Sequence, residues 1–335
     1  MIPTDERDPP IEYRQLGRTG VTVSRIALGC GGFGGIGSAP ELFGRGESDQ
    51  EAFAIMDAAW EMGITLFDTA ASYGGGRSEM AIGKWLRAKG RAVRERAVLA
   101  TKVFHSVRGD PADRGLSRPR IQREIDGSLA RLGVEQVPLY MIHEPDPDTP
   151  LEETLGALEE LVRAGKAGAI GACNIEGWRL EQALAISAER GLARFDWVQN
   201  SCSLLDRAAE VDVLPVCARE GLGFTPFSPL AGGWLTGKYT RDGVRPPGSR
   251  MTLRPEWYRA YENERTFSAL EAFAAAARGR GVDRATLALA WLLSHPQVTS
   301  IIIGPRRPEH IESARSALDV RLSPNERDEI AALFG

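Results

Sequence analysis

The sequence predicts an α/β fold in which eight parallel strands and their helices close into a (β/α)8 or TIM barrel, with an N-terminal β-hairpin and extra C-terminal helices. From about residue 26 onward, short β-like runs alternate with amphipathic helical stretches, a pattern typical of βαβ units. Eight runs with seven or eight helices favour a closed barrel over an open doubly wound sheet. The runs are IALGC (26–30), ITLFD (64–68), AVLATK (97–102), VPLYMIH (137–143), AGAIGAC (167–173), FDWVQN (195–200), LGFTPFS (222–228) and TSIIIG (299–304).

A β-hairpin is expected ahead of the barrel. Two short β-like segments, 13–16 and 21–24, flank the sequence GRTG, whose glycines suit a turn. We expect this hairpin, at about 12–24, to plug the floor of the barrel.

Apolar residues three and four positions apart predict the one-sided helices of an outer ring. They are Ala52, Ile55, Met56, Ala59 and Trp60 in the first helix, and Leu151, Leu155, Leu158, Leu161 and Val162 in the fourth. Helical stretches around 284–294 and 325–334 exceed the eightfold repeat. The non-periodic segments 31–47 and 241–255 are predicted to be long loops, which on a barrel usually serve the active face.

Length and composition admit one large globular domain. The 335 residues fit a single barrel, since such barrels commonly run to about 250 residues or more. We therefore expect one domain over residues 1–335, with the barrel at about 26–318 and a C-terminal helix at about 324–334. Hydrophobic residues make up 43% of the chain and charged residues 26%, which is ordinary for a protein with a sizeable core.

Charge and cysteine usage argue against several classes of partner. The net charge of −4 gives no reason to expect nucleic acid or an anionic membrane. The N-terminal sequence MIPTDERDPP lacks the apolar core of a signal peptide, and no stretch approaches about 18 uninterrupted apolar residues. Four scattered cysteines without a CxxC pair indicate reduced thiols, and we expect a cytoplasmic protein.

Four polar residues, Asp68, Tyr73, Lys102 and His143, lie at or just beyond the ends of successive β-like runs. In a parallel barrel these ends converge on one rim, where the four groups could move a proton onto or off a carbonyl oxygen. We expect the charged neighbours to pull the tyrosine pKa down from about 10. Taken singly, the residues have ordinary roles as a helix cap, a loop anchor, a surface lysine and a core histidine. Their occurrence together at three successive strand ends favours chemistry.

At these positions the chain resembles the aldo-keto reductases, over nearly its whole length. The sequence FDTA at 67–70 followed by YG at 73–74 is similar to the family's signature, and TK at 101–102 is similar to its lysine element. The resemblance implies that Asp68, Tyr73, Lys102 and His143 form the catalytic tetrad. Tyr73 would donate the proton, Lys102 would favour the phenolate, Asp68 would hold Lys102, and His143 would orient the carbonyl.

The resemblance also implies a nicotinamide cofactor, NADP(H). The glycine-rich loop 227–238, after the seventh strand, resembles the family's pyrophosphate loop. Residues 304–310, after the eighth strand, resemble the element that holds the adenosine 2′-phosphate, because two arginines there precede a helix. No GxGxxG supports a Rossmann site. The implied cofactor-binding residues are Gly31, Asn174, Gln199, Phe227, Ser228, Leu230, Gly233, Lys238, Gly304, Arg306, Arg307 and His310.

Some positions depart from the family's pattern. Cys173 stands where a serine is usual, and Phe227 replaces the more common tyrosine, which keeps ring stacking but loses a hydroxyl. His310 replaces a frequent glutamine. Ser313 and Ala314 stand where a glutamate and an asparagine often contact adenine. We expect cofactor binding with altered affinity.

Two functions remain open, and a third is disfavoured. The leading hypothesis is an NADPH-dependent reductase of an aldehyde or ketone, and the alternative is a low-turnover NADP(H)-binding redox-sensing or regulatory subunit, similar to the potassium-channel β subunits. A metal-dependent hydrolase is disfavoured because the four histidines show no HxH or HExxH spacing, and no metal is expected. Monomer and homo-oligomer are both possible. The expected substrate-pocket residues are Phe33, Phe104, His105, Trp234 and Trp257.

Overall fold

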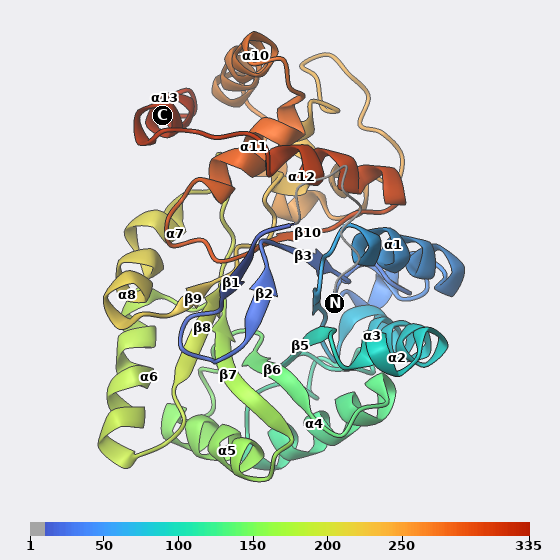
Figure 1. Cartoon of the computed structure of the whole chain (residues 1–335), viewed down its shortest axis with the longest axis vertical. Coiled ribbons are helices and arrows are strands. Elements are labelled where there is room, and N and C mark those ends of the chain that lie inside the picture. Colours follow the sequence, from blue (N-terminus) through green and yellow to red (C-terminus); the bar gives the residue numbers. More distant parts are fainter. Residues whose placement is uncertain (1–10) are drawn as a thin grey trace.

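The computed structural model describes residues 11–335, and the expectation about a signal peptide concerns residues outside that range. Figure 1 shows a ring of strands surrounded by helices. All eight expected strands are present and pair in parallel in the order β10-β3-β4-β5-β6-β7-β8-β9. They are β3 (Ile26–Gly29), β4 (Leu66–Asp68), β5 (Val98–Val103), β6 (Val137–Ile142), β7 (Ala167–Cys173), β8 (Phe195–Gln199), β9 (Gly223–Phe224) and β10 (Ile301–Ile303).

Backbone hydrogen bonds between β9 and β10, the two ends of this strand order, close the ring. The Thr299 N–H donates to the Phe224 carbonyl at 2.9 Å, and the Ile302 N–H donates to the Pro226 carbonyl at 2.9 Å. These bonds join the β9 and β10 segments, so the sheet has no long free edge. The predicted TIM barrel is confirmed.

The N-terminal hairpin consists of β1 (Tyr13–Gln15) and β2 (Thr22–Ser24), which pair antiparallel. Figure 1 shows it lying across the barrel. The Leu16 side chain, at the turn, is fully buried in the same apolar cluster as inward-facing residues of the barrel strands such as Leu139 and Trp197. Gly17 approaches the start of β9 so closely that a Cβ there would overlap the Gly223 backbone. The hairpin therefore closes the end of the barrel at which the strands begin, as expected.

The outer ring follows the strands in order. Its helices are α1 (Asp49–Glu61), α2 (Arg77–Lys89), α4 (Arg118–Leu132), α5 (Leu151–Arg163), α6 (Gly177–Arg190), α8 (Val213–Glu220), α11 (Arg284–Leu293) and α12 (Glu312–Ala317). The additional helices are α3 (Arg91–Arg94), α7 (Ala208–Val211), α9 (Arg250–Leu253), α10 (Glu264–Gly279) and α13 (Pro324–Ala332). The C-terminal helix was expected from the sequence.

One helix has a different place from the one expected. The stretch around 284–294 was expected to be extra to the ring, but α11 packs against α12 and β10, and its residues from Thr286 to Leu292 are all buried. Such all-round burial requires neighbours on every side, which the ring supplies. Figure 1 shows α10 farther out, and α10 and α13 are the longest of the additional helices.

The predicted loops border the end of the barrel where the strands finish. Segment 31–47 contains one short 3-10 turn, Pro40–Leu42. The next residue, Ser48, forms a capping box with Glu51 at the start of α1. Segment 241–255 contains only the four-residue α9 and the beginning of a 3-10 turn. Among residues 11–335, no helix is both long and apolar enough to cross a membrane.

Candidate active site

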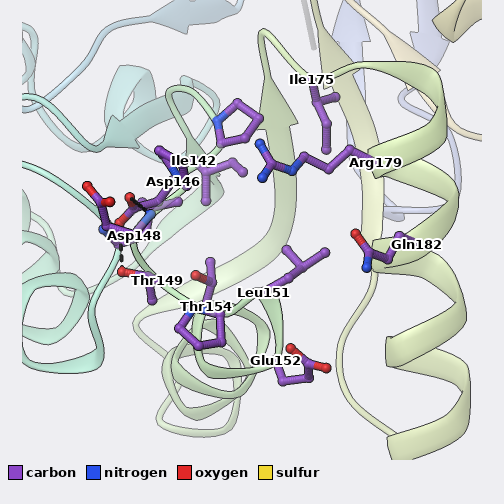
Figure 2. Close-up of a pocket in the computed structure, with 14 residues that line it drawn as sticks. Ile142, Asp146, Asp148, Thr149, Leu151, Glu152, Thr154, Ile175, Arg179 and Gln182 are labelled. Atoms are coloured by element: carbon purple, nitrogen blue, oxygen red, sulfur yellow. Dashed lines mark hydrogen bonds between the residues drawn. The ribbon is translucent and has the colours of Figure 1, made fainter.

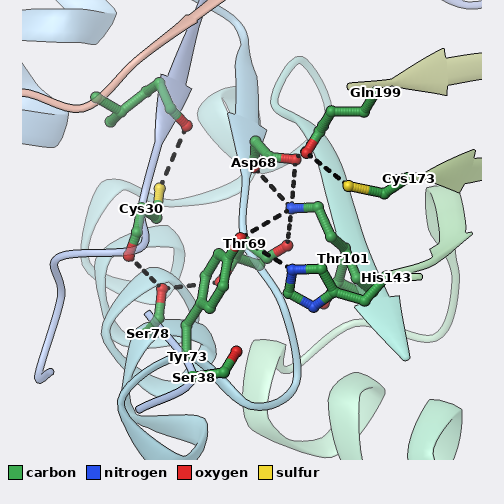
Figure 3. A network of polar contacts seen from close by, with 12 residues as sticks. Cys30, Ser38, Asp68, Thr69, Tyr73, Ser78, Thr101, His143, Cys173 and Gln199 are labelled. Atoms are coloured by element: carbon green, nitrogen blue, oxygen red, sulfur yellow. Dashed lines mark hydrogen bonds and ion pairs between the residues drawn. The ribbon is translucent and has the colours of Figure 1, made fainter. Parts of the chain in front are cut away.

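The four polar residues meet at the end of the barrel where the strands finish. Figure 3 shows Asp68, Tyr73 and His143 there. Asp68 is the last residue of β4, Lys102 lies near the end of β5, and His143 directly follows β6. Tyr73 begins the 3-10 turn Tyr73–Gly76 that leads into α2. Because neighbouring strands are parallel, their ends bring these side chains to one place.

The Lys102 ammonium lies at the centre of the group. Its Nζ donates to both carboxylate oxygens of Asp68, at 2.8 and 2.7 Å, and to the Thr69 carbonyl at 2.8 Å. The Tyr73 phenol oxygen is 3.5 Å from this Nζ and 3.4 Å from Nε2 of His143. The phenol therefore contacts a cation on one side and an imidazole on the other.

A glycine turn brings the phenol to this position. Gly74 and Gly75, directly after Tyr73, have φ values of 59° and 68°, which L side chains rarely adopt. A Cβ on Gly74 would also lie within 2.9 Å of the Phe33 and Gly34 backbone. The sequence YGGG therefore forms a tight turn against the first barrel loop. This turn places the Tyr73 ring at the mouth of the barrel.

Burial dominates the electrostatics of Tyr73. It raises the pKa of this phenol to about 12, although Lys102 opposes the rise while Asp68 and Cys173 add to it. The expectation that charged neighbours would lower this pKa is therefore wrong, because burial outweighs the effect of Lys102 and Asp68 cancels part of that effect. At neutral pH the phenol keeps its proton.

The other two titrating groups are shifted in opposite directions. Burial disfavours the charged form of Lys102, but Asp68, Tyr73 and Cys173 together outweigh it and the pKa of the ammonium is raised. Burial, together with the nearby Lys102, holds the pKa of His143 well below its usual value. The site thus contains a neutral phenol, an ammonium, a carboxylate and a neutral imidazole. The neutral phenol can donate its proton and so act as a general acid.

Asn174 and Gln199, two of the expected cofactor-binding residues, lie beside this group together with Cys173. Gln199 Nε2 donates to Asp68 at 2.9 Å, and Asn174 Nδ2 donates to the His143 carbonyl at 2.9 Å. The Cys173 sulfur is 3.3 Å from Asn174 Nδ2 and 3.8 Å from Gln199 Oε1. Asn174 has a φ of 53°, which turns its backbone toward the mouth of the barrel.

The loop after β9 has the backbone of an anion-binding segment. Phe227 is half-buried and packs over the barrel interior. Ser228 and Ala231 have φ values of 55° and 48°, a conformation that non-glycine residues adopt only under constraint. Leu230 and Gly233 follow in the same segment, which continues as the 3-10 turn Ala231–Thr236. Such turns direct successive N–H groups toward one side.

A cluster of cations lies beside this loop. Burial, with Arg250 and Arg306 nearby, lowers the pKa of Lys238, and burial lowers the pKa of Arg250 in the same way. The Arg250 side chain has no hydrogen-bond or ion-pair partner among residues 11–335. Its place in the sequence PPGSR, within a predicted loop, gave no signal that it would join the cluster.

The segment after β10 adds the remaining cofactor candidates. Arg306 Nε donates to Glu47 at 2.8 Å, its Nη1 donates to the Gly248 carbonyl at 2.7 Å, and its N–H donates to His310 Nδ1 at 3.2 Å. Arg307 and Gly304 are exposed. Arg250 is partly buried and Lys238 is exposed, and neither has an acid partner among residues 11–335. Together with the left-handed backbone of the loop after β9, they fit the phosphates of a dinucleotide.

The five expected substrate-pocket residues separate into three groups. His105 lies against His143, with ring centroids 4.8 Å apart, and Phe104 packs edge-on against His105. Phe33 and Trp234 are 1% and 0% exposed and belong to the apolar core. Trp257 is 65% exposed, under the guanidinium of Arg254. Of the five, His105 therefore contacts the tetrad, and the buried Phe104 packs behind it.

A separate cavity of about 320 Å³ lies between the segment after β6 and helix α6 (Figure 2). Ile142 and Ile175 line it together with Arg179, but none of the four tetrad residues does. Among residues 11–335, no group of three or more His, Cys, Asp or Glu side chains could hold a metal ion.

The family model that matches this chain is that of the aldo/keto reductase family, over residues 25–334. The chain belongs to this family. It is thus an oxidoreductase of a family that typically uses NAD(P)H and acts on small carbonyl compounds.

The relatives of this chain have names that indicate different functions. The chain is 39% identical to an uncharacterised oxidoreductase, YrpG, of Bacillus subtilis, covering 93% of this chain and 92% of the relative. It is 34% identical to a probable voltage-gated potassium channel subunit beta of rice, covering 96% of each chain. It is 33% identical to an NADH-specific methylglyoxal reductase of Escherichia coli, covering 92% and 94%.

Proposed function

We propose that this protein is an NADPH-dependent reductase that converts an aldehyde or ketone to an alcohol, with Tyr73 as the proton donor. The observation that carries the proposal is the position of the Tyr73 oxygen, 3.5 Å from Lys102 Nζ and 3.4 Å from His143 Nε2. A carbonyl oxygen that met this phenol would also meet the imidazole. When bound, the cofactor would supply the hydride that reaches the carbonyl carbon.

Each tetrad residue has a distinct task in this reaction. Tyr73, whose pKa of about 12 keeps it protonated at neutral pH, gives its proton to the oxygen as negative charge develops there. Lys102 stabilises the phenolate that remains, and Asp68 holds Lys102 through two hydrogen bonds. The neutral His143 orients the carbonyl by a hydrogen bond from Nε2.

The cofactor would lie between the tetrad and the cation cluster. Phe227 offers a ring face for the nicotinamide, and Asn174 and Gln199 lie where its carboxamide would be bound. Lys238 and Arg250 would bind phosphate oxygens. Arg306, with the exposed Arg307, supports a preference for the additional 2′-phosphate of NADPH, since guanidinium groups bind phosphate in a bidentate manner.

The substrate would enter beside Phe104 and His105. Burial, with nearby arginines, lowers the pKa of His105 to about 4, so this side chain is neutral and adds no charge to the mouth. The His105 ring next to His143, with Phe104 packed against it, favours a carbonyl compound with an apolar or aromatic portion.

A regulatory subunit with slow turnover is the second candidate. The similarity to a protein named as a potassium channel subunit beta favours it. Presence of all four tetrad groups favours turnover but is compatible with both functions. Oxidation of bound NADPH by a panel of aldehydes and ketones, followed at 340 nm in a single turnover, separates the two. No oxidation by any compound, despite cofactor binding, would contradict the reductase.

The role of Tyr73 is tested by Tyr73→Phe. We expect a loss of about 10²- to 10⁴-fold in kcat, with NADPH affinity nearly unchanged, because only the proton donor is removed. Tyr140→Phe is the matched control. Tyr140 is fully buried on the neighbouring strand β6, and its hydroxyl has no hydrogen-bond partner among the described residues. Near-normal turnover of Tyr73→Phe would contradict the assignment.

A further inference from the structure

The buried carboxylate of Glu47 has no task in the proposed reaction, yet it lies among the cations assigned to the cofactor. Glu47 is 5% exposed and directly precedes α1. Its N–H donates to the Gly32 carbonyl and its carbonyl accepts from the Gly34 N–H, both at 2.8 Å. The first barrel loop therefore holds this residue in place by its backbone.

The two oxygens of the carboxylate have different surroundings. Oε1 accepts the hydrogen bond from Arg306 Nε. Oε2 is buried and has no hydrogen-bond partner among residues 11–335. It lies directly over Gly32, where a Cβ would collide with it. A buried carboxylate oxygen without a partner is costly, so this oxygen is suited to accept a hydrogen bond from a ligand.

Glu47 also occupies part of the guanidinium that a phosphate would use. A phosphate bound in a bidentate manner takes two neighbouring N–H groups of an arginine. In Arg306, Nε donates to Glu47 and Nη1 donates to the Gly248 carbonyl. Nε, with its single N–H, is therefore engaged by Glu47, and one N–H of Nη1 is engaged by the Gly248 carbonyl. A phosphate that binds through Nε must displace Glu47 or share this N–H with it.

Glu47 counteracts the positive charge of the cluster. Burial lowers the pKa of Arg250 and Arg306 adds to this, whereas Glu47 opposes it. Lys238, the third cation, has no acid partner among residues 11–335. A carboxylate at this place repels a bound 2′-phosphate. It favours a free 2′-hydroxyl, because a carboxylate oxygen can accept a hydrogen bond from it.

We propose that Glu47 is a specificity-determining residue for the cofactor: it competes with the adenosine 2′-phosphate for Arg306, and its Oε2 accepts a hydrogen bond from a ribose 2′-hydroxyl, so that the preference for NADPH is reduced and NADH is also bound. This inference rests on the proposed function. The inference concerns the ratio of the affinities for NADPH and NADH. This ratio is set by the difference in binding free energy between the two complexes.

Glu47→Gln tests the inference by isothermal titration of the whole protein with NADPH and with NADH. Glutamine keeps the size and the acceptor for Arg306 Nε but removes the charge. We expect the ratio of NADPH to NADH affinity to rise by about tenfold or more. Glu51→Gln is the matched control. Glu51 is an exposed carboxylate one turn away, Arg306 contributes to lowering its pKa, and glutamine can retain the capping box.

A double-mutant cycle shows whether Glu47 acts through Arg306. In an Arg306→Ala background, Glu47→Gln should raise the affinity ratio less than in the wild type, because only the contact between Oε2 and the ribose hydroxyl is then lost. An unchanged or lowered ratio in Glu47→Gln would overturn the inference, as would an equal rise without Arg306 or an equal rise in Glu51→Gln. If Glu47→Gln does not fold, Glu47→Asp withdraws the carboxylate by one methylene and should shift the ratio in the same direction. An unchanged ratio there would also overturn it.

Failure of the proposed function gives a different result. Wild-type protein that binds neither cofactor would contradict the function, and with it this inference. Wild-type protein that binds both, with the same affinity ratio in Glu47→Gln, would contradict the inference alone.

Discussion

Tyr73 shows how a single side chain depends on its surroundings for its chemistry. Its oxygen lies close to an ammonium, which by itself would lower the pKa of the phenol, yet burial and Asp68 together raise that pKa to about 12. A donor that keeps its proton at neutral pH suits carbonyl reduction, because the proton is needed only when negative charge develops on the oxygen.

These shifts predict the pH dependence of reduction. Tyr73 stays protonated below a pKa of about 12, and His143 stays neutral above a pKa well below 6.5. We therefore expect kcat/KM for reduction to be level from pH 6.5 to about pH 9, measured with NADPH and an aldehyde substrate. The rate should fall at lower pH only once His143 begins to gain a proton. A steep loss of rate within the level range would show that another group governs proton transfer.

At the scale of elements, a buried ion pair joins the strand that carries Lys102 to two ring helices. Glu79, on α2, is fully buried and accepts hydrogen bonds at 2.6 Å from Thr101 Oγ1 on β5 and from Arg131 Nε on α4. Thr101 directly precedes Lys102, and α2 begins directly after the turn that carries Tyr73. The pair thus fixes the turn and the strand to each other.

Arg131→Met tests the importance of this pair. It leaves the Glu79 carboxylate buried without its cation, and we expect the free energy of unfolding to fall by about 3–5 kcal/mol. Arg123→Met is the control on the same helix. The Arg123 side chain is 57% exposed in its ion pair with Asp113, and its loss should cost about 1 kcal/mol or less. Chemical denaturation measures both, and equal losses would mean that the Glu79 pair is no stronger than a surface pair.

At the scale of the whole molecule, the hairpin closes one end of the barrel and the site lies at the other. Its turn contains Gly17 and Gly20, with φ values of 54° and 75°. A Cβ on Gly17 would overlap backbone atoms of Asp196 and Gly223, whereas a Cβ on Gly20 would meet no atom within 4 Å. The two glycines have similar backbone conformations but very different surroundings.

This contrast predicts different effects of alanine. Both substitutions strain the backbone, by about 1–2 kcal/mol, but Gly17→Ala must also move the hairpin away from β8 and β9. We expect Gly17→Ala to lower the thermal midpoint by several degrees more than Gly20→Ala, as measured by circular dichroism. Similar midpoints for the two variants would show that the contact between hairpin and barrel contributes little to stability.

Much of the fold could be predicted because short-range patterns in the sequence indicate its strands, helices and turns. The eight apolar runs, the periodic faces of α1 and α5, and the glycine turn after Tyr73 are all short-range features, and the structure has each of them. The position of α11 in the ring could not be predicted, because a helix apolar on most sides can be buried in several places.

The sequence by itself determined the parallel barrel and the meeting of Asp68, Tyr73, Lys102 and His143 at one end, because strand order and strand ends follow from the chain. Only the tertiary structure decided the raised pKa of Tyr73, the burial of Trp234, and the gathering of Glu47, Arg250 and Arg306. These depend on how loops distant in sequence fold over the barrel, since burial and through-space charge are properties of neighbours that no local pattern records.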